Sequence, residues 1–334
     1  MPIRIGGNSS THPSNPASDS LSSPKSNSVS GNPVSPDEVF IPEIPQYSFA
    51  DIVLPKTVKE KLLDAADYAR NSALVFDQWG LGKTHKHNRG LGINLYGPPG
   101  TGKTMGAHAI ANYLGRKILV VNYADIESKY VGETPKNIRH AFEVAEKTHS
   151  IIFFDEADAI LSKRVTNMNS ATDVSVNQTR SVMLMIMNSY SDFIIFATNF
   201  IQNFDPAFMR RIARHVKFEM PDQECRARLW KMYIPSQMPN NVDIDEIANK
   251  YKDISGSDIS TAVLNAAFKA ARLKEPMVDK KYVFEAIEDI IKSRLANQGY
   301  TITTKPVSKE YVKDRLGYLP DEKKEQQPVE DKED

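Results

Sequence analysis

Residues 97–104, which read Gly-Pro-Pro-Gly-Thr-Gly-Lys-Thr, constrain the fold of this chain more than any other stretch. A short apolar segment at 93–96 precedes them, and a helical pattern at 105–114 follows them. Glycines at this spacing allow a tight turn whose backbone N–H groups point toward a phosphate group, and the positive end of the next helix favours the same anion. The order strand, glycine-rich turn, helix therefore predicts a phosphate-binding loop.

The polar residues of this loop and of a later segment predict the chemistry of the site. We expect the Lys103 ammonium group to reach the β- and γ-phosphates of a nucleotide, and the Thr104 hydroxyl to bind Mg²⁺. Asp155 and Glu156 directly follow the apolar run 151–154. An aspartate at the end of a buried strand holds Mg²⁺ through its water shell, and the adjacent glutamate polarises an attacking water as general base.

Apolar runs alternate with helical patterns through the first two thirds of the chain, which predicts an α/β fold with a doubly wound parallel sheet. In such a sheet, ligands bind at the carboxyl ends of the strands. The expected strands lie at 93–96, 118–121, 151–154, 193–197 and 216–218. The expected helices between them include one capped by Thr134 and one at 178–187, with a polar loop at 165–176 before the latter.

After Pro221 only helical patterns occur, which predicts a small all-helical lid domain beside the sheet. The expected lid helices cover 223–233, 243–250, 256–273 and 279–295. We place the α/β nucleotide-binding domain at 47–220 and the lid at 221–300. Residues 1–46 are rich in Ser, Asn and Pro and 301–334 are polar and charged, so both are expected to be disordered tails.

Composition excludes several classes of protein. Lys and Arg number 42, as do Asp and Glu, which argues against nucleic acid as the principal partner. The single cysteine, Cys225, excludes an intramolecular disulfide and favours a reducing, cytoplasmic compartment. No stretch approaches the roughly 20 apolar residues of a membrane span, so none is expected.

The ordered set of motifs resembles the AAA+ ATPases, and within them the AAA proteins that remodel or thread other proteins. The resemblance covers about residues 47–295. The segments that carry it are 97–104, 128–134, 151–158, 197–199, 207–211 and 255–258. The resemblance implies ATP and Mg²⁺ as cofactors, with Asp155 and Thr104 holding the metal and Glu156 activating water. It also implies that Asn199 is a polar sensor between that water and the γ-phosphate.

The resemblance further implies which residues bind the nucleotide and which act between subunits. The expected nucleotide-binding residues are Asp51, Ile52, Gly97, Pro98, Pro99, Gly100, Thr101, Gly102, Lys103, Thr104, Gly256 and Ser257. Arg210 and Arg211 resemble arginine fingers, which reach the nucleotide of a neighbouring subunit. Adjacent residues of a helix point about 100° apart, so we expect one arginine to meet the γ-phosphate and the other to hold the interface. The sequence leaves open which does which.

Lys129, Tyr130 and Val131 resemble the pore loop of this family, whose aromatic ring grips a polypeptide in a central channel. An aromatic side chain binds extended chains through apolar area with little demand on their sequence. The resemblance thus implies a homo-oligomeric ring, a hexamer, that acts on a protein substrate or adaptor, with a HORMA-fold protein as one option. Two alternatives stay open: a nucleic-acid-directed AAA+ motor or loader, and a nucleotide-dependent assembly scaffold.

Overall fold

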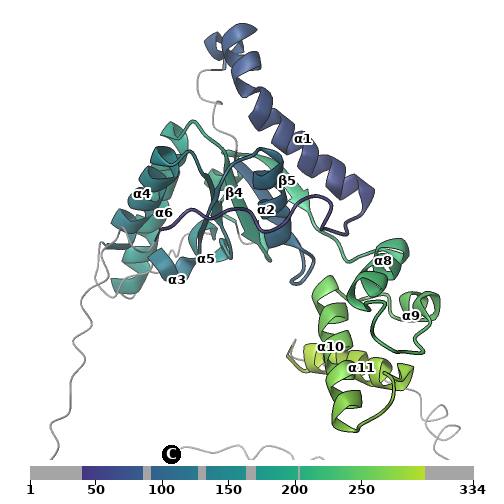
Figure 1. Ribbon diagram of the computed structural model, residues 1–334. Helices are drawn as coiled ribbons and strands as arrows, with labels where there is room; N and C mark the ends of the chain where they lie inside the picture. The colour runs from purple at the N-terminus through teal and green to yellow at the C-terminus, as the bar shows by residue number, and fades with distance from the viewer. Residues whose placement is uncertain (1–39, 86–91, 127–132, 163–170, 202–203, 298–334) are drawn as a thin grey trace, which may run out of the picture.

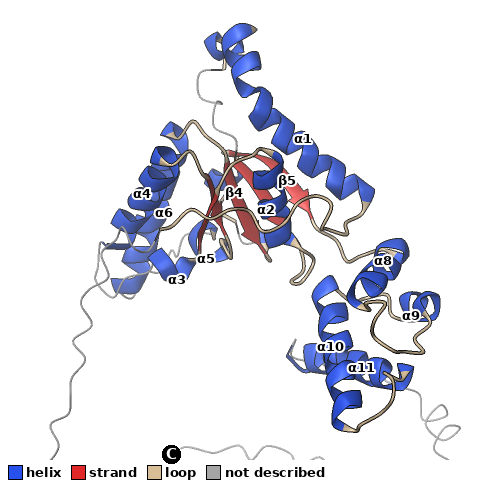
Figure 2. Cartoon of the chain, in the orientation of Figure 1, coloured by secondary structure: helices blue, strands red, loops and turns tan. Residues whose placement is uncertain are grey.

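The computed structural model describes residues 40–85, 92–126, 133–162, 171–201 and 204–297. They form an α/β unit around one sheet and a group of helices beside it (Figure 1). Figure 2 shows that strands occur together in the centre of the first unit, with helices on both sides.

Five parallel strands form the sheet, in the order β2-β3-β4-β1-β5. Their bounds are β1 (Gly92–Tyr96), β2 (Ile118–Val121), β3 (Ile151–Phe154), β4 (Ile194–Thr198) and β5 (Ile212–Lys217). The predicted doubly wound α/β class is therefore confirmed. β1 lies inside the sheet between β4 and β5, so the phosphate loop that follows it leaves from the carboxyl edge of the sheet.

Helices cover both faces of the sheet, and this is why the central strand β3 is apolar along its whole length. On one face lie α1 (Lys56–Ala73) and α2 (Lys103–Tyr113). The other face is covered by a larger group of helices. They are α3 (Tyr123–Ile126), α4 (Glu133–Lys147), α5 (Asp158–Leu161), α6 (Ala171–Ser189) and α7 (Pro206–Met209). The chain after α1 forms a π-helical turn, η2 (Leu74–Gln78), and a 3₁₀ turn, η3 (Leu81–Lys83).

The second unit is all-helical, as expected, and has a hydrophobic core of its own. It contains α8 (Gln223–Tyr233), α9 (Ile244–Lys250), α10 (Gly256–Arg272) and α11 (Lys280–Asn297). Trp230 of α8 is fully buried among residues of the other three helices. A capping box between Ser255 and Asp258 fixes the start of α10, because each side chain binds a backbone N–H of the other residue.

Several predicted boundaries are wrong. The ordered chain begins before Tyr47: Phe40 is buried, and Glu43 exchanges two backbone hydrogen bonds with Ile118 at the edge of the sheet. The composition of a segment does not reveal local strand pairing of this kind. Thr134 is not a cap, because α4 already begins at Glu133. The helix expected at 178 begins at Ala171, inside the predicted loop.

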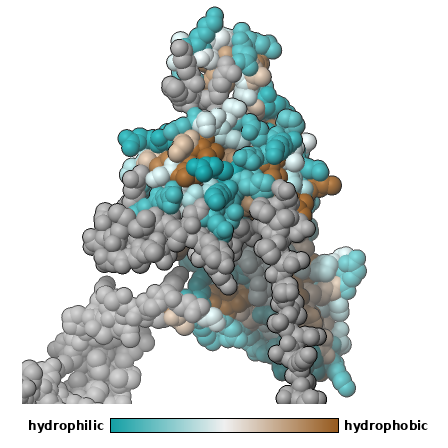
Figure 3. Space-filling view, turned by 90° about the vertical axis from the view of Figure 1, so that its left-hand side faces the viewer, coloured by the Kyte–Doolittle hydropathy of each residue, from teal (hydrophilic) through white to brown (hydrophobic). Residues whose placement is uncertain are grey.

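The length and apolarity of the described helices bear on membrane crossing, and the hydropathy of one face of the surface can be seen directly. None of the helices in the described ranges combines the length and apolarity that crossing a membrane requires. On the face drawn in Figure 3, the hydrophobic side chains of the described residues form separate small areas among hydrophilic ones.

Candidate nucleotide-binding site

The phosphate loop turns so tightly that three of its positions need glycine. Gly97, Gly100 and Gly102 have φ angles of 146°, 74° and 95°, which residues with a side chain rarely adopt. A Cβ atom on Gly97 would lie 2.0 Å from the carbonyl oxygen of Phe218. A Cβ on Gly100 would lie 2.6 Å from Oγ of Ser255, at the start of α10. The loop is therefore pressed against both the sheet and the helical unit.

Lys103 is the first residue of α2, and its side chain folds back over the loop. Its Nζ donates hydrogen bonds to the carbonyl oxygens of Gly97 and Pro98, both at 2.9 Å, and to Oδ1 of Asn199 at 2.8 Å. Burial lowers the pKa of Lys103, while the nearby charge of Asp155 opposes this effect. The ammonium group thus lies where the loop, α2 and the end of β4 meet, the position from which a lysine contacts a phosphate chain.

Thr104 and Asp155 meet at the carboxyl ends of β1 and β3. Oγ1 of Thr104 donates to Oδ2 of Asp155 at 2.7 Å, and Oδ1 of the same carboxylate accepts the backbone N–H of Glu156. A hydroxyl beside a carboxylate is a set of hard oxygen donors that fits Mg²⁺. The described residues include no group of three or more His, Cys, Asp or Glu side chains arranged around a metal, so phosphate oxygens would complete the coordination.

Glu156 follows in an unusual backbone conformation. Its φ angle is 49°, in the left-handed region that is strained for a residue with a side chain. Such strain persists where the surrounding structure fixes it, and it is common at functional sites. The Glu156 side chain is exposed beside the Asp155 carboxylate, and this position suits a general base that acts on water at the site.

Asp158 is a residue whose role the sequence reasoning missed. Its carboxylate accepts a hydrogen bond from Oγ1 of Thr198, and also the backbone N–H groups of Asn199 at 3.2 Å and Phe200 at 3.3 Å. These contacts fix the turn after β4 and aim Asn199 at Lys103. The only sequence signal was a third acidic residue, two positions after Glu156, and this signal does not identify a partner.

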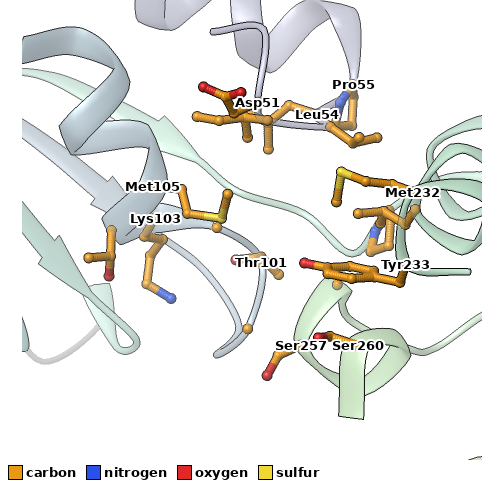
Figure 4. A pocket seen from close by; sticks show the side chains of 18 of the residues that line it. Asp51, Leu54, Pro55, Thr101, Lys103, Met105, Met232, Tyr233, Ser257 and Ser260 are labelled. Carbon is orange, nitrogen blue, oxygen red and sulfur yellow. The ribbon is translucent and has the colours of Figure 1, made fainter. Parts of the chain in front are cut away.

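A pocket of about 350 Å³ adjoins the loop on the side of the helical unit. Asp51 and Ile52 line it from the segment before α1, Gly256 and Ser257 from the start of α10, and Tyr233 from the end of α8. Figure 4 shows Thr101 of the loop among side chains from these elements, with Tyr233 and Ser257 on the opposite side of the space from Asp51. The predicted binding residues Asp51, Ile52, Gly256 and Ser257 therefore all line this pocket. Met232 and Tyr233 also line it, but they were not predicted.

A second pocket, also about 350 Å³, lies on the other side of the loop. Gly97, Pro98 and Pro99 line it together with Asn199 and Phe200. Every residue of the predicted loop 97–104 therefore lines one of these two pockets. A nucleotide could place its base on the Tyr233 side and its phosphates along the loop toward Asn199.

Arg210 and Arg211 do not lie at this site. The prediction that both arginines are helical is wrong. They form the turn between α7 and β5, because α7 ends at Met209. Gly92 pairs with Ile212 at the amino ends of the parallel strands β1 and β5. The arginine turn thus lies at the amino ends of the strands, whereas the phosphate loop lies at their carboxyl ends. The five residues of β1 separate the two, roughly 16 Å at about 3.3 Å per residue.

The two arginines have different surroundings. Nε of Arg211 donates to Oδ1 of Asn188 at 2.7 Å, and one of its terminal nitrogens donates to the carbonyl oxygen of Ala207 at 2.8 Å. The guanidinium group of Arg210 is exposed and makes no hydrogen bond or ion pair with another described residue. Arg210 is therefore the arginine available to a second molecule. The predicted pore-loop residues Lys129, Tyr130 and Val131 lie outside the described residues.

The fold and the loop define the class of protein. A parallel sheet, a glycine-rich turn after an inner strand, and a lysine at the start of the next helix form a nucleotide-binding α/β domain. Residues 93–220 match the model of the family described as "ATPase family associated with various cellular activities (AAA)". This part of the chain is therefore similar to the ATPase domains of that family.

Two curated relatives extend the match beyond this domain. The chain is 31% identical over 261 residues to the 26S proteasome regulatory subunit 6B homolog of Encephalitozoon cuniculi, covering 75% of this chain and 65% of the relative. It is 32% identical over 216 residues to the proteasome-activating nucleotidase of Methanopyrus kandleri, covering 62% of this chain and 49% of the relative. The chain thus spans less than two thirds of the length of either relative.

Proposed function

We propose that this protein binds Mg²⁺-ATP at the loop 97–104 and hydrolyses it in a ring of identical subunits that remodels a protein substrate. The backbone N–H groups of the loop and the Lys103 ammonium group bind the phosphates. Thr104 and Asp155 hold Mg²⁺, which neutralises negative charge on the β- and γ-phosphates when bound. Nucleotide binding requires the Lys103 ammonium group to exchange its carbonyl contacts for phosphate oxygens.

Glu156 and Asn199 act on the attacking water in this proposal. The Glu156 carboxylate accepts the proton of the water, and the Asn199 amide orients the water toward the γ-phosphate. The Asp158 carboxylate holds Asn199 in place by accepting the backbone N–H of Asn199. The strained φ of Glu156 and the bond between Lys103 and Asn199 support these roles, because both bring the side chains to the same end of the sheet.

The separation of the arginine turn from the phosphate loop is the observation that carries the oligomeric part of the proposal. Arg210 cannot reach the phosphates of its own subunit across the length of β1. It is exposed and unpaired within the described chain, so it is free to enter the site of a neighbour. Contacts that join one surface to a different surface of the next copy close into rings, and we propose a hexamer.

A protein is the substrate that the relatives and the composition favour. Both relatives have names that connect them to the proteasome, which degrades proteins. Equal numbers of basic and acidic residues give no excess positive charge to hold nucleic acid. We propose that Tyr130 grips the polypeptide as it moves through the centre of the ring. The partner is a protein substrate or an adaptor, and a HORMA-fold protein is one option.

Stimulation of ATP hydrolysis tests this choice of substrate. The ATPase rate of the full chain is measured with an unfolded protein, with single-stranded DNA and with neither. We expect the unfolded protein alone to raise the rate, and Tyr130→Ala to remove this stimulation while keeping the basal rate. Stimulation by DNA alone would establish the motor or loader alternative, and a rate near zero in the assembled ring would establish the scaffold alternative.

A further inference from the structure

Two polar side chains with buried atoms, on neighbouring strands, lie between the phosphate loop and the arginine turn. Asn94 is in the middle of β1, three residues before the loop begins, and its side chain is fully buried. Its register partner on β5 is His215, four residues after Arg211. Register partners in a parallel pair point to the same face of the sheet, so the two side chains are direct neighbours.

Both side chains contain buried atoms that the rest of the described chain does not satisfy. Oδ1 and Nδ2 of Asn94 and Nδ1 of His215 have no hydrogen-bond partner among the described residues. A buried amide without a partner is destabilising, and one that is hydrogen-bonded is not. An apolar residue would pack at position 94 without this penalty, as Ile93 and Leu95 do on the opposite face.

The backbone around His215 belongs to the arginine turn. The carbonyl groups of Met209 and Ile212, on either side of Arg210 and Arg211, face the imidazole; they oppose the effect of burial, which lowers its pKa. At neutral pH the ring is therefore uncharged, with one nitrogen that donates a hydrogen bond and one that accepts. The pairing of β1 with β5 shifts register between Gly92 and Ile93, directly beside this turn. Bulges of this kind re-aim neighbouring side chains.

We propose that His215 is a positioning residue for Arg210 and that Asn94 orients it. In the assembled ring the two unsatisfied groups turn toward each other, so that Nδ2 of Asn94 donates to Nδ1 of His215 and the imidazole N–H holds a carbonyl of the arginine turn. The strand that ends in the phosphate loop thereby sets the position of the arginine offered to the neighbouring subunit. This inference rests on the proposed function, because it requires that Arg210 acts in a second subunit.

The position of the arginine must be well defined for it to act. A misplacement of about 1 Å can reduce a rate roughly 10²-fold, and an arginine finger supplies 10³–10⁵ in rate. The turn follows a helix of only four residues. Among the described contacts of the turn, the side chain of Arg211 provides two hydrogen bonds, and the imidazole lies against the carbonyl groups on either side.

Mixed rings separate this role from a general effect on the fold. Acceptor subunits carry Arg210→Ala and keep an intact nucleotide site. Donor subunits carry Glu156→Gln, so they provide Arg210 but do not hydrolyse ATP themselves. The ATPase rate of the mixture then reports on donor arginines in acceptor sites. His215→Val is introduced either into the donors or into the acceptors, and assembly is checked by sedimentation.

We expect His215→Val to lower the rate about tenfold or more in donors and less than twofold in acceptors. Asn94→Leu should show the same asymmetry without altering β5, and combining both substitutions in donors should add little, because they break one chain of contacts. His215→Asn, which keeps a donor and an acceptor, should retain most of the rate. Arg214→Ala is the matched control, since its guanidinium lies 5.9 Å from the ring of Tyr68 on the other face.

The outcomes distinguish this inference from the proposed function. Equal losses in donors and acceptors would overturn the positioning role and show that His215 and Asn94 only support the fold. If Asn94→Leu assembles but has no donor effect, the contact with His215 is wrong. If mixtures with unaltered His215 are inactive, the proposal that Arg210 acts in a neighbouring subunit fails instead.

Discussion

Nζ of Lys103 donates a hydrogen bond to Oδ1 of Asn199 at 2.8 Å, joining the start of α2 to the end of β4. Two residues that are 96 positions apart in the chain thus meet beside the phosphate loop. The same ammonium group also bonds to the carbonyl oxygens of Gly97 and Pro98. The Lys103 side chain therefore folds over the loop. In the proposed function, phosphate oxygens replace these acceptors when the nucleotide binds.

Substitution of Asn199 should separate nucleotide binding from hydrolysis. Asn199→Ala removes one competitor for the Lys103 ammonium group and the amide that orients water, so we expect unchanged or tighter ATP binding and a turnover about 10²-fold lower. Asn199→Asp should weaken binding, because a carboxylate holds the ammonium group more strongly than an amide does. Equilibrium binding of ATP and single-turnover hydrolysis measure the two effects. Parallel losses of both in Asn199→Ala would contradict this role.

Asp158→Ala should impair hydrolysis without removing ATP binding. The substitution leaves the N–H of Asn199 without its acceptor, while the N–H of Phe200 keeps Oγ1 of Thr198. A hydrogen bond to a charged group contributes about 1.5–3 kcal/mol. We expect turnover to fall roughly tenfold to hundredfold. Asp158→Asn keeps an acceptor oxygen and serves as the conservative control. An unchanged rate in a folded Asp158→Ala protein would show that the turn holds Asn199 without it.

Much of this site could be predicted from the sequence because parallel strands end at the same edge of a sheet. Lys103 and Thr104 end the loop that follows one apolar run, and Asp155 and Asn199 follow two others. The structure joins Lys103 to Asn199 and Thr104 to Asp155 by hydrogen bonds. The role of Asp158 could not be predicted, because its partners Thr198, Asn199 and Phe200 become neighbours only when β3 and β4 pair.

The limits of the sequence reasoning have the same physical origin. Phe40 and Glu43 belong to the segment predicted to be disordered. The backbone of Glu43 is hydrogen-bonded to Ile118 of β2, 75 positions later, and amino-acid composition cannot reveal such a contact. Arg210 and Arg211 read as helical, but their turn is set by the pairing of β5 with β1. Local patterns predicted the elements, while contacts across the fold decided where they begin and end.

Gly100→Ala should weaken ATP binding by displacing the helical unit from the loop. A Cβ atom there would lie 2.6 Å from Oγ of Ser255 and 2.8 Å from Cβ of Ser257, at a φ of 74°. We expect affinity to fall about tenfold, equivalent to about 1.4 kcal/mol, in an equilibrium titration. Gly80→Ala is the control: its φ is 77°, but nothing lies within 4 Å of its added Cβ. Similar losses in both variants would argue against a steric effect at α10.

Glu156→Gln should bind ATP and hydrolyse it about 10²–10⁴-fold more slowly, because an amide cannot accept the proton of the attacking water. Retained ATP should also favour the assembled ring, which sedimentation detects, and should trap bound substrate for identification. Glu146→Gln, an exposed change on α4, is the matched control and should leave the rate unaltered. Normal hydrolysis by Glu156→Gln would assign the base to another residue.

Complementation between two inactive variants tests the central claim, that Arg210 acts at the nucleotide of a neighbouring subunit. Arg210→Ala subunits have an intact nucleotide site without an arginine, and Glu156→Gln subunits provide the arginine without a base. Alone, each should hydrolyse ATP slowly. The ATPase rate of Arg210→Ala at fixed concentration should rise as Glu156→Gln subunits are added. A rate that never exceeds the sum of the two separate variants, at any ratio, would contradict the account.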